Sequence, residues 1–313
     1  MKQAQDYHVG GSWPGPPDPQ PQPADRNPPP RNATWYNGQA MSQRMLQRYA
    51  ASASRAALTA GALLVKHVGR PRTVATKRSA IDLVTEVDRA AEALIERMLH
   101  RTYPDFGFFG EEHGRRQQRS PYRWIVDPID GTINFVHGLP LFGVSIGLEH
   151  RGAMLVGVIY DPMRRELFVA TKGGGAFLNG KRIRVSSVRR LSHSLLSTGF
   201  SSSFLKHPQP YRGWFEAFQR QSHGVRRIGS TVFSLAAVAA GRLEGFYEQD
   251  LWPWDIAAGL LLVQEAGGRA SNFSGQAVVL EGGQLVASNG HIHTEMLRVI
   301  RHPSPSLRVA SRV

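Results

Sequence analysis

The sequence predicts a layered α/β fold, an α+β arrangement in which helices cover two sheets. Two amphipathic helical patterns come first, and short strand-like runs separated by turn residues follow between 107 and 170. From about 190 the pattern restarts as strand, helix and strand. We therefore expect an N-terminal α/β half at 39–190 and a C-terminal α/β half at 191–302.

Two helices are predicted before the first strand. In the first helix, apolar or small residues recur at three- and four-residue steps: Met45, Tyr49, Ala53, Ala56, Ala60 and Leu63. The second helix, over about 84–100, places five apolar residues on one face: Val87, Ala91, Leu94, Ile95 and Met98. These stripes indicate helices that lie against a core.

The strands and later helices follow from runs of apolar residues bounded by turn chemistry. Strands are predicted at 107–109, 124–126, 142–149, 154–160 and 167–170. Gly173–Gly175 and Asn179–Gly180 are typical of turns. In the second half we expect helices at about 230–241, 254–266 and 291–300, with a strand at 285–287.

The ends of the chain have a different composition from the rest. Nine of the 20 prolines occur in the first thirty residues, a composition that cannot build a packed core. We expect a disordered Pro-rich tail at 1–38 and a flexible C-terminal tail at 303–313. The start lacks the apolar segment of a secretory signal and no run approaches a membrane span, which favours a cytoplasmic protein without membrane contact.

Cysteine content and net charge bound the function further. The absence of cysteine excludes disulfides, thiolate metal sites and a thiol nucleophile. The formal charge of +14 comes from scattered arginine pairs without interleaved aromatic residues, which favours a solvated basic surface. Binding to nucleic acid stays possible on these grounds but lacks a supporting motif.

The stretch from Trp124 to Phe135 carries the main chemical signal. Trp124, Ile125 and Val126 indicate a buried strand that we expect to break at Asp127-Pro128, with Asp130 in the following Asp-Gly-Thr turn. The two carboxylates could then project together beside amides freed by the glycine, as a magnesium-dependent phosphate site requires. The alternative is an ordinary Asp-Gly turn between two elements.

Two further acidic motifs favour the metal site. Gly110-Glu111-Glu112 follows an apolar strand end, and Trp254-Asp255 opens an apolar helix. With the Asp127–Phe135 motif between them, from about Ala40 to Ile300, the chain resembles the inositol monophosphatase family of magnesium-dependent, lithium-sensitive phosphatases. The resemblance implies an αβαβα sandwich of the inositol monophosphatase / fructose-1,6-bisphosphatase type, with the site between the halves. It also implies a homodimer, and Pro253-Trp254 is similar to bacterial members.

The resemblance also implies roles for individual residues. Two or three Mg²⁺ ions would be held by five residues: Glu111, Asp127, Ile129 through its carbonyl, Asp130 and Asp255. The catalytic set would be Glu111, Asp130 and Thr132, with Thr132 and Glu111 orienting the attacking water. The substrate contacts would be Gly131, Thr132, Gly229, Ser230 and Glu248, and the weaker candidates near the metals are Lys77 and Asp88.

Several of these residues also have ordinary structural interpretations. Asp255 suits the first turn of any helix, because an acid there is favoured by the helix dipole. Ser230 is a good N-cap for the following apolar helix, and Glu248 could be a surface residue at a strand end.

The resulting expectation is a phosphomonoesterase for a small polyol phosphate. The family resemblance points to hydrolysis of myo-inositol 1-phosphate to inositol and phosphate. The alternatives within the superfamily are histidinol phosphate, fructose 1,6-bisphosphate and 3′-phosphoadenosine 5′-phosphate, because the metal site recognises the phosphate and the pocket recognises the alcohol. The alternative from another class is an RNA- or transcription-associated binding protein.

Overall fold

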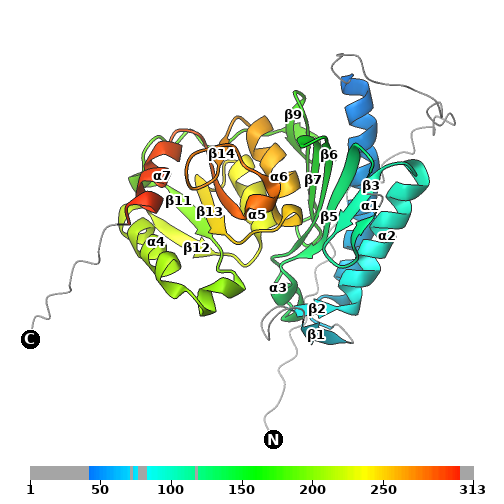
Figure 1. Ribbon diagram of the computed structural model, residues 1–313, viewed down its shortest axis with the longest axis horizontal. Helices are drawn as coiled ribbons and strands as arrows, with labels where there is room; N and C mark the ends of the chain where they lie inside the picture. The colour runs from blue at the N-terminus through cyan, green and yellow to red at the C-terminus, as the bar shows by residue number, and fades with distance from the viewer. Residues whose placement is uncertain (1–41, 71–72, 77–82, 117–118, 304–313) are drawn as a thin grey trace, which may run out of the picture. The chain divides into compact units, whose positions relative to one another are not determined.

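The computed structural model describes residues 42–70, 73–76, 83–116 and 119–303 (Figure 1). The predicted tail at 1–38, residues 304–313 of the predicted C-terminal tail, and Lys77 lie outside the described residues.

The first sheet has eight strands in the order β10-β9-β8-β7-β6-β5-β3-β4. In chain order they are β3 (Gly107–Gly110), β4 (Gly114–Arg116), β5 (Tyr122–Asp130), β6 (Gly143–His150), β7 (Ala153–Asp161), β8 (Glu166–Thr171), β9 (Gly175–Leu178) and β10 (Lys181–Arg182). Among the described strands of this sheet, β3 and β5 pair in parallel and the remaining pairs are antiparallel. The β9–β10 turn places Asn179 and Gly180 at φ 48° and 78°, the left-handed conformation that their sequence predicts.

The second sheet has five strands in the order β12-β11-β13-β15-β14. They are β11 (Leu195–Thr198), β12 (Gly224–Arg227), β13 (Gly245–Gln249), β14 (Arg269–Ser271) and β15 (Gln284–Ser288). A separate antiparallel pair, β1 (Val74–Thr76) and β2 (Leu83–Thr85), precedes the first sheet along the chain.

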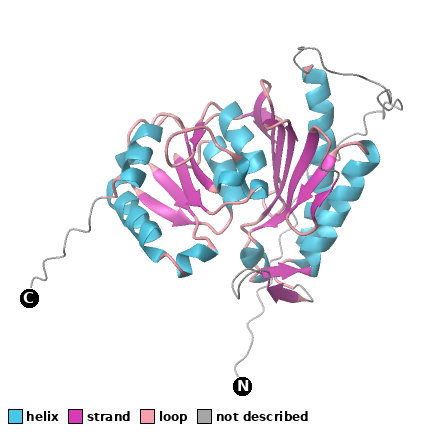
Figure 2. Ribbon diagram, in the orientation of Figure 1, coloured by secondary structure: helices cyan, strands magenta, loops and turns pink. Residues whose placement is uncertain are grey.

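Helices separate and cover the two sheets (Figures 1 and 2). Helices α1 (Gln43–His67) and α2 (Glu86–Thr102) pack on one face of the eight-stranded sheet. On its other face lie α5 (Thr231–Ala239) and α6 (Pro253–Glu265), which also contact the five-stranded sheet. Helices α4 (Pro208–Gln221) and α7 (His293–Arg301) pack against the five-stranded sheet on the side away from α5 and α6. The layers are therefore αβαβα, and the predicted fold class is confirmed.

The composition of the helices explains their layers. Helix α1 buries one stripe of alanines, whereas α5 and α6 are buried on almost every side because a sheet lies on each side of them. Short helical turns complete the described chain: α3 (Thr132–Val136), η1 (Leu191–His193), η2 (Ser202–Leu205) and η3 (Leu280–Gly282). The predicted helices and strands are present, with small differences at their ends.

Candidate metal centre

The side chains of β5 alternate between two cores. Trp124 and Val126 pack among the residues beneath α1 and α2, whereas Ile125 packs in the core formed with α5 and α6. Because side chains of a strand alternate between its faces, Asp127 faces the same way as Ile125, toward α6. Asp127 is only 2% exposed, and its Oδ1 accepts the Ile129 N–H at 2.9 Å.

A β-bulge then brings the second acid to the same face. The pairing of β5 with β6 shifts register between Asp127 and Asp130, and Ile129 packs beneath α1 and α2. Uninterrupted alternation would send Asp130 to that face instead, so the shift is what places both carboxylates toward α6. The predicted break at Asp127-Pro128 is wrong, because the strand continues through Pro128 to Asp130. Proline is tolerated there since a bulge leaves one N–H unpaired.

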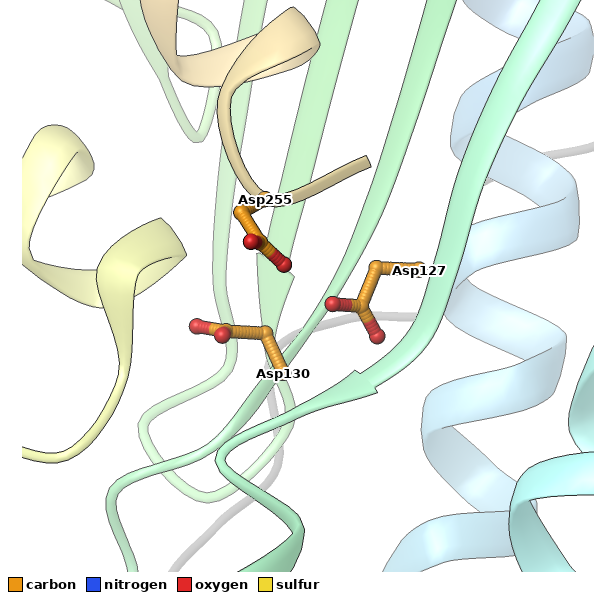
Figure 3. Close-up of side chains that lie close together, drawn as sticks. All are labelled: Asp127, Asp130 and Asp255. Carbon is orange, nitrogen blue, oxygen red and sulfur yellow. The ribbon is translucent and has the colours of Figure 1, made fainter. Parts of the chain in front are cut away.

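The third acid comes from the first turn of α6. Asp255 accepts the Trp252 N–H at 2.7 Å, so it stabilises the helix start as its sequence position suggested. Oxygens of Asp127, Asp130 and Asp255 all lie within 4.8 Å of one another (Figure 3). Asp255 can therefore both stabilise the start of α6 and belong to the acidic cluster. Through α6, the second half of the chain places this residue near the end of β5.

The electrostatics of the three acids favour a cation between them. Burial raises the pKa of Asp130 to about 6, although hydrogen bonds from Ser230 and the Val232 N–H oppose the shift. Burial also raises the pKa of Asp255 well above its usual range, and the charges of Asp130 and Glu111 raise it further. A cluster of three carboxylates, which among the described residues includes no histidine or cysteine, fits a hard divalent cation such as Mg²⁺.

Glu111 and Thr132 lie at the edge of this cluster. Glu111 follows β3, and its N–H donates to the Val126 carbonyl of β5 at 3.2 Å. It lies outside the three-acid cluster, although its charge acts on Asp255. The Thr132 hydroxyl donates to the Ile129 carbonyl at 3.1 Å or to Oδ1 of the buried Asp88 at 3.3 Å, so Asp88 of α2 contacts the turn that follows Asp130.

Two of the predicted substrate residues adjoin Asp130: Gly131 follows it in the chain, and Ser230 donates a hydrogen bond to it. Gly131 has φ 94°, and a Cβ there would lie 2.9 Å from the Leu141 carbonyl, so only glycine fits. Ser230 donates to Asp130 and also accepts the Phe233 N–H at 3.1 Å, which confirms its predicted N-cap role.

Glu248 lies in the same region, at the end of β13. Its Oε2 accepts the Thr231 hydroxyl at 3.1 Å, and burial raises its pKa to about 8, helped by the nearby charge of Asp130. The carboxyl is therefore half-buried beside the three acids rather than free at the surface.

Two residues near the site were not predicted. Asn134 donates from Nδ2 to the Leu141 carbonyl at 2.7 Å and the Ile228 carbonyl at 3.0 Å, which ties α3 to the loop before α5. Glu92 is completely buried on α2, four residues after Asp88. The sequence does contain a sign of this buried position, because Glu92 is a carboxylate on a helix face that otherwise carries Val87, Ala91 and Ile95.

Known proteins resemble this chain over most of its length. The model of the inositol monophosphatase family matches residues 45–304. The protein named Nus factor SuhB from Pseudomonas aeruginosa is 43% identical over 263 residues, which cover 82% of this chain and 97% of that protein. Inositol-1-monophosphatase from Mesorhizobium japonicum is 41% identical over 251 residues, covering 80% and 94%.

Solved structures agree with these relatives. Inositol monophosphatase from Anabaena superposes with a TM-score of 0.77 at 37% identity, covering 84% of this chain and 98% of that one. Extragenic suppressor protein suhB from Bartonella henselae superposes with a TM-score of 0.78 at 39% identity, covering 81% of this chain and 98% of that one. The fold is that of the layered α/β proteins to which these structures belong. The chain is a member of the inositol monophosphatase family.

Within the part of the chain that the structure describes, no helix combines the length and apolar character needed to cross a membrane.

Proposed function

We propose that the protein is a Mg²⁺-dependent phosphomonoesterase that hydrolyses a small polyol phosphate, with myo-inositol 1-phosphate as the preferred substrate. The observation that carries this proposal is the convergence of Asp127, Asp130 and Asp255 within 4.8 Å at the junction of β5 and α6. Membership of the family and the relatives named inositol-1-monophosphatase support the choice of ester.

The proposed metal ligands are the three clustered acids together with Glu111 and the carbonyl of Ile129. They would hold two or three Mg²⁺ ions. When bound, Mg²⁺ would supply a lower pKa for a coordinated water and would neutralise charge on the phosphate and the leaving oxygen.

The remaining roles belong to groups of the chain itself. The Thr132 hydroxyl donates its proton in a hydrogen bond to Asp88 or the Ile129 carbonyl, so its oxygen is free to accept a hydrogen bond from the attacking water and orient it. Glu111 would orient the same water from the end of β3, and Asp130 completes the proposed catalytic set. The N–H groups of Gly131 and Thr132 would donate to phosphate oxygens.

The alcohol part of the substrate would lie against the second half of the chain. We assign this contact to Gly229, Ser230 and Glu248, because Ser230 touches Asp130 and Glu248 lies close enough for its charge to be felt there. Glu248 would accept a hydrogen bond from a substrate hydroxyl.

The test is phosphate release from myo-inositol 1-phosphate, histidinol phosphate, fructose 1,6-bisphosphate and 3′-phosphoadenosine 5′-phosphate. Each ester is assayed with Mg²⁺, with EDTA and with Mg²⁺ plus Li⁺, for the wild type, Asp127→Asn and the exposed control Asp105→Asn. We expect Mg²⁺-dependent turnover that Li⁺ inhibits, that the control keeps and that Asp127→Asn loses. Folded wild-type protein that binds Mg²⁺ but releases phosphate from none of the esters would contradict the enzymatic proposal.

A second function is favoured by the relatives named Nus factor SuhB, which are 43% identical to this chain in two species. Together with the charge of +14, they support a role in binding RNA or a transcription complex. Binding of RNA that weakens steeply with salt and survives in Asp127→Asn would support this role as separate from catalysis. Sedimentation of the same samples would test the homodimer that the family resemblance implies.

A further inference from the structure

Glu92 is a buried carboxylate on α2 that has no role in the proposed chemistry. It is 0% exposed, on the face of the helix that packs toward the eight-stranded sheet. Burying a carboxylate is costly unless several hydrogen bonds compensate, so its position calls for a specific set of partners.

Those partners are the residues that immediately follow Glu111. Oε2 of Glu92 accepts the Glu112 N–H at 2.8 Å, and Oε1 accepts the His113 N–H at 2.7 Å. A third hydrogen bond, also 2.7 Å long, joins Oε1 to Nδ1 of the His113 ring. One carboxylate therefore holds two successive amides and a side chain of the same turn.

The residue before Glu111 is fitted to the same carboxylate. A Cβ on Gly110 would lie 2.4–2.5 Å from the three carboxyl atoms of Glu92, closer than any two such atoms can approach. Because Glu92 is held by three hydrogen bonds, it could move only by giving them up. Glycine at position 110 thus allows β3 to pass directly over the carboxylate.

Glu111 is consequently fixed from both directions. Its own N–H is bonded to the Val126 carbonyl of β5, one residue before Asp127, and the two N–H groups after it are bonded to Glu92. A turn with three anchored amides in succession has little freedom to change the direction of its side chains.

We propose that Glu92 is a positioning residue for the metal centre, which sets the backbone of the turn at 110–113 so that Glu111 is held ready to bind the cation. This inference rests on the proposed function, because it takes Glu111 as a metal ligand. It assigns Glu92 no contact with the substrate or the metal.

The test compares Glu92→Gln with a matched control, Glu265→Gln. Glu265 also accepts two backbone N–H groups of one turn, those of Gly173 at 2.7 Å and Gly175 at 2.8 Å, but it lies at the end of α6 opposite to Asp255. Mn²⁺ binding to each protein is measured by electron paramagnetic resonance in the absence of substrate, and kcat and KM are measured as a function of Mg²⁺.

We expect Glu92→Gln to weaken Mn²⁺ binding by about 10- to 100-fold, as changes to groups that orient metal ligands commonly do. The Mg²⁺ concentration for half-maximal activity should rise in parallel, while KM at saturating Mg²⁺ stays near the wild-type value. Glu265→Gln should leave Mn²⁺ affinity unchanged even if it lowers the melting temperature. Mn²⁺ affinity equal to wild type in folded Glu92→Gln would overturn the inference.

A second variant approaches the same contact from the other side. Gly110→Ala should displace the Glu92 carboxylate and weaken Mn²⁺ binding. In a protein that already carries Glu92→Gln, the same substitution should weaken Mn²⁺ binding by a smaller factor than it does in the wild type. Fully additive losses would show that Gly110 and Glu92 act separately and would overturn the inference. If Glu92→Gln proved too unstable to study, Gly110→Ala alone would decide, and wild-type Mn²⁺ affinity in that folded variant would overturn the inference. Wild-type protein that binds Mn²⁺ but hydrolyses no ester would contradict the proposed function alone, since the binding comparison would still report on Glu92.

Discussion

The hydroxyl of Ser230 donates a hydrogen bond to the carboxylate of Asp130, although the two residues are separated by 99 others along the chain. Asp130 ends β5 of the eight-stranded sheet, and Ser230 is the N-cap of α5, which packs between the sheets. One side chain therefore stabilises a helix start and fixes an acid of the metal centre. The metal centre is thereby tied to the start of a helix in the second half of the chain.

Ser230→Ala should lower both stability and metal affinity. The loss of an N-cap costs about 1 kcal/mol of the free energy of unfolding, and Asp130 loses one of its hydrogen-bond donors. Denaturant unfolding in EDTA measures the first effect, and Mg²⁺ titration of activity measures the second. Ser230→Thr keeps the hydroxyl and should retain more of both; a threonine variant as impaired as the alanine variant would show that packing at this site matters more than the hydrogen bond.

Asn134→Ala should loosen the junction between α3 and the loop before α5. It removes donors to the Leu141 and Ile228 carbonyls, which leaves two poorly solvated acceptors and should cost about 2 kcal/mol of unfolding free energy. Chemical denaturation gives this value directly. A cost below the error of the measurement would mean that water replaces the amide at both carbonyls.

Glu248→Gln should change how the stability of the metal-free protein depends on pH. The folded-state pKa of Glu248, about 8, is above its ordinary 4.5, so folding is favoured by its proton. The contribution of protonated Glu248 to the free energy of unfolding is fully present below about pH 4.5 and is lost as the pH rises through about 8. The variant should lose stability less steeply over this range than the wild type.

Unfolding in EDTA between pH 5 and pH 9 would measure the difference between Glu248→Gln and the wild type. In Glu248→Gln, the unfolding free energy should fall less steeply with rising pH than in the wild type. It should still fall, because Asp130 and Asp255 also have raised pKa values. Identical slopes in both proteins would contradict the assignment to Glu248. With substrate, the same variant should raise KM more than it lowers kcat if Glu248 binds the alcohol.

His293 should make the protein sensitive to acid at a point away from the metal centre. It is fully buried between the hydroxyls of Ser271 and Ser288, each 2.9 Å from a ring nitrogen. Burial lowers its pKa from 6.5 to about 4. Between these pH values the histidine is protonated in the unfolded chain and neutral in the folded protein. The stability contributed by neutral His293 is complete above about pH 6.5 and is lost as the pH falls toward 4, by about 3 kcal/mol.

The comparison for His293 is with His293→Gln, which can still form hydrogen bonds but does not titrate. Unfolding free energies between pH 4 and pH 7 should fall less steeply for this variant than for the wild type. If both proteins lose stability in parallel, the acid sensitivity lies in other groups.

Local pattern in the sequence was enough to place most elements of the fold. The alanine stripe of α1, the apolar faces of α2 and the runs of β5 to β8 each express the period of their own secondary structure, and they need no distant partner to be recognised. The acids Asp127, Asp130 and Asp255 could be named for the same reason, because each stands in a short motif at the end or start of an element.

The geometry of the centre was decided by tertiary structure. The bulge in β5 depends on pairing with β6, and without it Asp127 and Asp130 would face opposite sides of the sheet. The roles of Glu92 and Asn134 depend on partners about 20 and 94 residues away, which no local period encodes. The sequence by itself determined which residues could do chemistry, since that is a matter of side-chain type and local conformation. Only the packed structure decided which of them meet, because proximity between distant segments is set by the burial of both sheets against α5 and α6.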